Sequence, residues 1–105
     1  MKIIDFKSVS PLFEMERDGE KPFNIRKIDP KDKRFRALSQ WQPSYNWGIR
    51  ITNPATGESF IREIVAVSFL RYFDAREVDP RKRQATFFDW KIIVLGELVP
   101  PEKGG

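Results

Sequence analysis

Apolar and polar residues alternate along much of the chain, which predicts a mainly β protein. The pattern is clearest in Trp47–Thr52, where Ile49 and Ile51 fall on one face of the expected strand and Arg50 falls on the other. Four further stretches have strand character: Lys2–Lys7, Pro22–Ile28, Ser59–Phe73 and Ala85–Leu98. The alternation changes near Ile64, and Gly96 interrupts the last stretch, so both positions are typical of a bend or bulge.

One or two short helices are expected near the start of the chain. Ser10 and Pro11 predict the start of the first, because serine caps helices and proline loses no hydrogen bond at the first helical position. Gly19 predicts its end, since glycine readily adopts the left-handed conformation that terminates helices. A second helical turn is expected over 29–38. The side of the first helix expected to face water comprises Glu14, Glu16 and Arg17.

About five strands in a chain of 105 residues favour a small barrel, closed or nearly closed, because closure hides the edges of the sheet. A β-sandwich is the alternative. The length fits one domain, expected over residues 1–99, with a frayed tail over residues 100–105.

The composition excludes several kinds of site. The chain has no cysteine and no histidine, which rules out disulfides, thiolate or imidazole metal ligands and histidine-dependent triads within it. We therefore expect no cofactor. The first residues lack the apolar core of a signal peptide, and no apolar run is long enough to span a bilayer, so a cytoplasmic protein is expected.

Positive charge is concentrated in two places. The chain carries a net charge of +4, and the segment 25–36 alone holds six basic and two acidic residues. A second cluster is Arg81–Arg83. Such segments attract polyanions, although runs of charge are also typical of solvated loops.

The stretch DGEKPFNIRKID, from Asp18 to Asp29, combines a turn with two cations. Gly19 allows a sharp turn, Lys21 follows it, and Arg26 extends from one face of the next strand, which it shares with Asn24. If the turn folds Lys21 back over that face, the two cations converge as a phosphate site, and Asn24 can read a base edge. The alternative is a purely structural role, in which Gly19 caps the helix, Lys21 is solvated and Arg26 pairs with a nearby aspartate.

The longer stretch FEMERDGEKPFNIRKID resembles the signature of the ASCH domain, a branch of the PUA-like β-barrels. That signature is a helix that ends in G-x-K, followed by x-x-E-x-R on the next strand, and Gly19, Lys21 and Arg26 match it. Phe13 matches an aromatic residue that family members often carry on the helix. TGESFIREIVAV and DWKIIVLGEL resemble later strands of small phage and bacterial members. The resemblance is strongest over 12–28 and weaker over 56–73 and 87–98.

This resemblance implies a small barrel that binds RNA, single-stranded nucleic acid or a modified nucleoside. The usual glutamate of the signature is replaced by Asn24, and relatives that act as acetylcytidine amidohydrolases have a threonine there. An amide is neither a general base nor a hydroxyl nucleophile, so Asn24 favours binding over hydrolysis. The residues expected to contact nucleic acid are Gly19, Lys21, Asn24, Arg26, Lys27, Trp41, Arg50 and Arg62. Trp41 is the candidate for base stacking, because polar residues surround it.

Two other classes of function stay open. One is an enzyme, an amidohydrolase or ribonuclease, in which a desolvated Lys21 acts with Glu63 as its carboxylate partner. The other is a protein-interaction role, such as an inhibitor carried by a phage-like element. The oligomeric state is not indicated by the sequence.

Overall fold

The computed structural model describes residues 1–73 and 87–100, which form five strands and two helices. The strands and helices, in chain order, are β1 (Lys2–Lys7), α1 (Leu12–Arg17), β2 (Phe23–Lys27), α2 (Lys33–Ser39), β3 (Trp47–Thr52), β4 (Ser59–Phe73) and β5 (Phe87–Val99). The expectation of a mainly β chain with one or two short helices is confirmed. The basic cluster Arg81–Arg83, and all of the expected tail except Pro100, lie outside the described residues.

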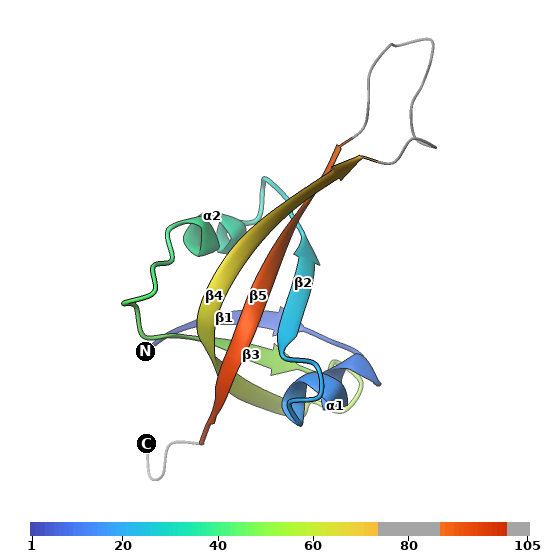
Figure 1. Ribbon diagram of the computed structural model, residues 1–105. Helices are drawn as coiled ribbons and strands as arrows, with labels where there is room; N and C mark the ends of the chain where they lie inside the picture. The colour runs from blue at the N-terminus through green and yellow to red at the C-terminus, as the bar shows by residue number, and fades with distance from the viewer. Residues whose placement is uncertain (74–86, 101–105) are drawn as a thin grey trace.

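The strands form one curled sheet in the order β1-β3-β4-β5-β2, so β1 and β2 are its two edges. β1 runs parallel to β3, and the other pairs are antiparallel. Figure 1 shows β4 curving along its length, so that β3 and β1 run crosswise to β5 and β2. The result is a half-barrel, compatible with the expected small barrel, and the described residues contain no second sheet of a sandwich.

The curvature of β4 has a local cause in its pairing with β5. Arg62 lies opposite Leu98 while Ile64 lies opposite Leu95, so β5 uses one residue more than β4 over this interval. This extra residue falls in the segment that contains Gly96. Between Ile64 and Ala66, which pair with Leu95 and Val94, the extra residue is on β4. Bulges of this kind bend a strand and increase its twist. A Cβ at Gly96 would lie 2.5 Å from the Val65 side chain, so a larger residue there would clash with β4. The irregularities expected at Ile64 and Gly96 are confirmed.

The core fills the inside of the curl. Alternate residues of the strands point inward, among them Ile49, Ile51 and Ile93, which are fully buried. The helices add aromatic side chains at two places. Phe13 of α1 packs against Phe60 with ring centroids 5.2 Å apart, and Phe35 of α2 packs against Phe6 at 6.0 Å. Both helices therefore cover parts of the curl that the strands leave open.

Both helices begin later than expected. Pro11 is the N-cap residue of α1 and makes no side-chain cap, so the prediction that Ser10 caps this helix is wrong. The Ser10 hydroxyl instead donates to a carboxylate oxygen of Glu14 at 2.5 Å. α2 begins at Lys33 because the Asp32 side chain caps it, accepting a hydrogen bond from the backbone N–H of Arg34 at 2.9 Å.

In the strand β2 the usual burial of apolar side chains and exposure of polar side chains is reversed. Its apolar residues Phe23 and Ile25 are exposed, whereas Asn24 is buried and Arg26 is half-buried. The two faces predicted from alternation are confirmed, and the polar face is the one directed into the half-barrel. Polar groups are buried at a cost unless they find hydrogen-bond partners. The partners of Asn24 and Arg26 therefore define the candidate site.

Within the described residues, neither helix is long and apolar enough to span a membrane.

Candidate functional site: a buried polar network beside a basic cleft

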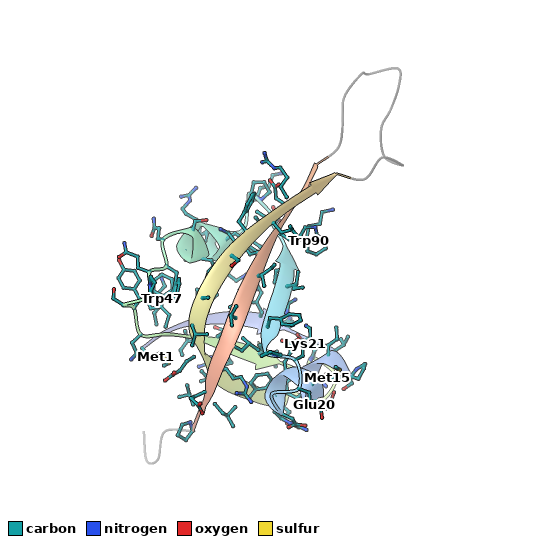
Figure 2. The ribbon with its side chains drawn as sticks, viewed as in Figure 1. Met1, Met15, Glu20, Lys21, Trp47 and Trp90 are labelled. Carbon is teal, nitrogen blue, oxygen red and sulfur yellow. The ribbon has the colours of Figure 1, made fainter. Side chains whose placement is uncertain are left out.

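The turn between α1 and β2 brings Lys21 back towards the helix. Asp18 is the C-cap of α1, and Gly19 has φ of +83°, the left-handed conformation that was expected there. The backbone N–H of Lys21 then donates to the carbonyl of Met15 at 3.0 Å, which closes the turn. Figure 2 shows Lys21 beside this turn, with Glu20 and Met15 near it. The lysine is thus not on a freely solvated loop, and its side chain is only 17% exposed.

A buried carboxylate accounts for this position of the lysine. Glu16 is 1% exposed, and its oxygens accept hydrogen bonds from Ser8 Oγ at 3.2 Å, Asn24 Nδ2 at 2.5 Å and Lys21 Nζ at 3.4 Å. The expectation that Glu16 faces water is wrong. It follows Phe13 by three residues and therefore shares the buried face of α1, a spacing that could have indicated its position.

Arg26 completes the network and joins the two edges of the sheet. Its Nε donates to Asn24 Oδ1 at 2.6 Å, and its Nη2 donates to Ser8 Oγ at 3.1 Å and to the carbonyl of Lys7. Burial lowers the pKa of Arg26, the Glu16 carboxylate opposes that shift, and nearby Arg34 adds to it. Below, the Glu16 network means Ser8, Glu16, Lys21, Asn24 and Arg26.

A small hollow of about 230 Å³ opens onto this network, and we call it the Lys21 pocket. All five members of the Glu16 network line it, together with Lys7. The other lining residues are Val9, Leu12 and Ile25, which are exposed apolar side chains. The pocket therefore combines a polar floor with an aliphatic rim.

A larger hollow of about 730 Å³ follows the seam between β1, β2 and α2, and we call it the seam cleft. Its cations are Lys7, Arg26, Lys27 and Arg34, against the two acids Asp5 and Asp32. Phe6, Phe35 and Thr52 complete its lining. Lys7 and Arg26 line both hollows, so the Lys21 pocket and the seam cleft adjoin.

Two guanidinium groups that line the seam cleft contact one aromatic ring. Arg34 and Arg26 lie over the same Phe6 ring, at 4.3 and 5.0 Å from its centroid. Arg34 is held by Asp32, whose hydrogen bonds raise the pKa of this arginine, and it also donates to the carbonyl of Asp5 at 2.7 Å. Two cations held at fixed positions in the lining of one cleft make it a favourable place for an anion.

Among the arginines expected to bind nucleic acid, two lie away from the pocket and have structural partners. Arg50 Nη1 contacts Asp5 at 3.2 Å, across the pair of strands β1 and β3. Arg62 donates to the carbonyls of Glu16 at 3.0 Å, Arg17 at 2.7 Å and Gly96 at 2.8 Å. Arg62 thereby ties the end of α1 to β5.

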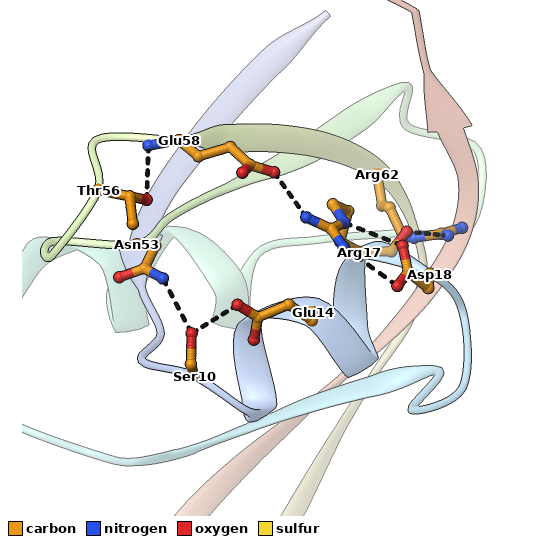
Figure 3. A network of polar contacts seen from close by, with 8 residues as sticks. All are labelled: Ser10, Glu14, Arg17, Asp18, Asn53, Thr56, Glu58 and Arg62. Carbon is orange, nitrogen blue, oxygen red and sulfur yellow. Dashed lines mark hydrogen bonds and ion pairs between the residues drawn. The ribbon is translucent and has the colours of Figure 1, made fainter.

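Figure 3 shows the polar contacts that fix α1 from its other side. Arg17 pairs with Glu58 at 2.8 Å, and the amide of Asn53 donates to Ser10 Oγ at 3.2 Å. The pair of Arg17 with Asp18, at 2.9 Å, lies within the end of the helix. A helix of six residues is too short to be stable by itself. These contacts and the Arg62 bonds therefore determine where α1 presents Glu16.

Two further predicted residues lie elsewhere. Glu63 lines a separate hollow with Tyr45 and Trp47, whereas the carboxylate beside Lys21 is that of Glu16. Trp41 is half-buried against the core, and its indole nitrogen is buried. Tyr45 is more exposed than Trp41, and it stacks on Trp47 with ring centroids 5.4 Å apart.

Comparison with models of protein families, with curated proteins and with solved structures finds no match to this chain. The resemblance to the ASCH signature therefore depends on the residues of the sequence. Of these, Gly19 forms the turn, and Lys21 and Arg26 both belong to the Glu16 network.

Proposed function

We propose that this protein binds single-stranded nucleic acid, RNA above all, with phosphates in the seam cleft and a base at the Lys21 pocket. The observation that carries the proposal is the cleft itself, in which four cations surround one hollow with only two acids. Arginine and lysine in such a cleft neutralise phosphates, and the release of counterions then supplies much of the affinity. The resemblance to the ASCH family supports the same ligand class.

A single strand fits the site better than a duplex. The Lys21 pocket is small, has an aliphatic rim and adjoins the cleft, which suits an unstacked base attached to a bound backbone. Proteins read single-stranded RNA in this way, by contacting splayed bases beside a basic groove. Asn24 is 2% exposed and both its amide atoms are engaged, so in this proposal it positions Glu16 and Arg26 and does not touch the base.

The lysine-dependent hydrolase is a less favoured function. An amine acts as nucleophile or base only when it is neutral, and a neighbouring carboxylate stabilises the charged ammonium. Lys21 Nζ lies 3.4 Å from Glu16, and Glu63 lines a different hollow. Binding is therefore the role that this arrangement supports best.

The proposal predicts that binding depends on salt and that Lys7 contributes to this dependence. Anisotropy titrations of a fluorescent ten-nucleotide RNA of mixed sequence, over a series of salt concentrations, should give an affinity that falls steeply as salt rises. Lys7→Ala removes one exposed cation from the cleft and should reduce the slope of log K against log salt by about 0.7.

Lys2→Ala is the matched control, because Lys2 is an exposed lysine of the same strand that lies over Trp47, outside the cleft. It should leave the slope unchanged. Absence of binding by the wild-type protein at the lowest salt concentration would overturn the proposal, and it would direct attention to a protein partner.

A further inference from the structure

The Lys21 pocket has the size and position of a subsite for one base. Pockets that enclose drug-sized ligands measure about 300–1,000 Å³. The Lys21 pocket, at about 230 Å³, is smaller, and it shares Lys7 and Arg26 with the seam cleft. A nucleotide whose phosphate lies in the cleft could therefore place its base in this pocket.

The rim of the pocket suits the faces of a flat ring. Val9, Leu12 and Ile25 line it, and each is between 42% and 57% exposed, although each is apolar. They come from the segment after β1, from α1 and from β2, so they surround the opening from different elements. A base inserted between them would cover apolar surface that is now in contact with water.

The floor offers hydrogen-bond donors. Lys21 Nζ has three protons, and Glu16 is its one hydrogen-bond partner among the described residues. Arg26 binds Asn24, Ser8 and Lys7 through Nε and Nη2, which leaves Nη1 without a partner in the described part of the chain. The side-chain acceptors of the floor are occupied, because the Glu16 oxygens already take three hydrogen bonds and Glu16 is 1% exposed.

The floor thus has donors available and its side-chain acceptors occupied. From this difference we infer that the Lys21 pocket selects a base by a carbonyl oxygen on its edge, and so prefers guanine to adenine. The inference rests on the proposed function, since it concerns the base of a bound strand. Guanine presents O6 and N7, both acceptors, and lysine and arginine are their commonest partners. Adenine presents an amino group in place of O6, which would set a donor against two cationic donors.

The test uses nine-nucleotide RNAs that differ only at the central base, in a background of adenines. Fluorescence anisotropy at one salt concentration would compare guanine, inosine, 7-deazaguanine and adenine at that position. Guanine and inosine should bind about tenfold more tightly than adenine, because both carry O6 and N7. 7-Deazaguanine keeps O6 alone, so its affinity should lie between those of guanine and adenine.

Two variants assign the selectivity to Lys21. Lys21→Met removes the donors and should reduce the preference for guanine to less than twofold. Lys21→Arg keeps donors in the pocket and should retain the preference. Lys2→Met, outside both hollows, is the control for loss of a lysine and should bind like the wild type.

The outcomes separate the inference from the proposed function. If none of the RNAs binds, the proposed function itself fails. If all four bind with equal affinity, or the adenine RNA binds most tightly, nucleic-acid binding stands and the inference is overturned. The comparison of the four RNAs on the wild-type protein decides this even if Lys21→Met does not fold.

Discussion

Replacement of Glu16 by alanine is expected to lower the free energy of unfolding by about 3–5 kcal/mol, the usual cost of removing one partner from a buried ion pair. Glu16 is 1% exposed, and its carboxylate is the common acceptor for Ser8, Lys21 and Asn24. Without it, the buried amide of Asn24 loses its acceptor and the ammonium of Lys21 loses its counter-charge. Urea denaturation followed by tryptophan fluorescence would measure the change.

Glu20→Ala is the matched control, since Glu20 is an exposed glutamate in the turn that follows the same helix. Its effect should stay within about 0.5 kcal/mol, as for most surface substitutions. Glu16→Gln keeps an oxygen acceptor and removes the charge, so its stability should fall between those of the wild type and Glu16→Ala. Equal stability of Glu16→Ala and Glu20→Ala would show that the carboxylate does not hold the network together.

The strands were predictable because their burial follows a period of two. Trp47–Thr52 and Ser59–Phe73 are strands with the expected bounds, and Gly96 lies in the bulge expected from its lack of a side chain. The curl of the sheet is a different matter. It arises from shifts in the pairing register between β4 and β5, and the pattern of residues along one strand does not indicate the register with its neighbour.

The site was predictable only in part, for a reason that Glu16 illustrates. Gly19, Lys21 and Arg26 were found from their local spacing. The pattern predicts that the side chain of Glu16 is exposed to solvent, because a glutamate on a short amphipathic helix is usually exposed. Its burial depends on Asn24 of β2 and on Ser8, which directly follows β1, and the two meet only after the edges of the sheet approach each other. The reversed polarity of β2 has the same origin.

Arg62→Met is expected to destabilise the protein by about 3 kcal/mol without changing the salt dependence of nucleic-acid binding. The guanidinium donates to three backbone carbonyls, those of Glu16, Arg17 and Gly96. Hydrogen bonds from a charged donor contribute about 1.5–3 kcal/mol each, and the methionine can fill the space but cannot donate. The expected loss is below the sum, because water can reach part of this region.

Arg50→Met is the control that makes this result interpretable. Arg50 lies on the neighbouring strand, and within the described residues its ion pair is with Asp5, whose side chain is 63% exposed. Exposed pairs of this kind contribute about 0–1 kcal/mol, so Arg50→Met should be far less destabilising than Arg62→Met.

The two roles considered for Arg62, a phosphate contact and a structural tie, predict opposite effects on stability and on the salt dependence of binding. A phosphate contact, the role expected from the sequence, would leave stability nearly unchanged and would reduce the slope of log K against log salt by about 0.7. A structural tie between α1 and β5 would lower stability and leave that slope intact at temperatures where the variant is folded. Because α1 presents Glu16, and Glu16 positions Lys21, the structural role also predicts weaker guanine selectivity in Arg62→Met. That would link a residue outside both hollows to recognition of the base.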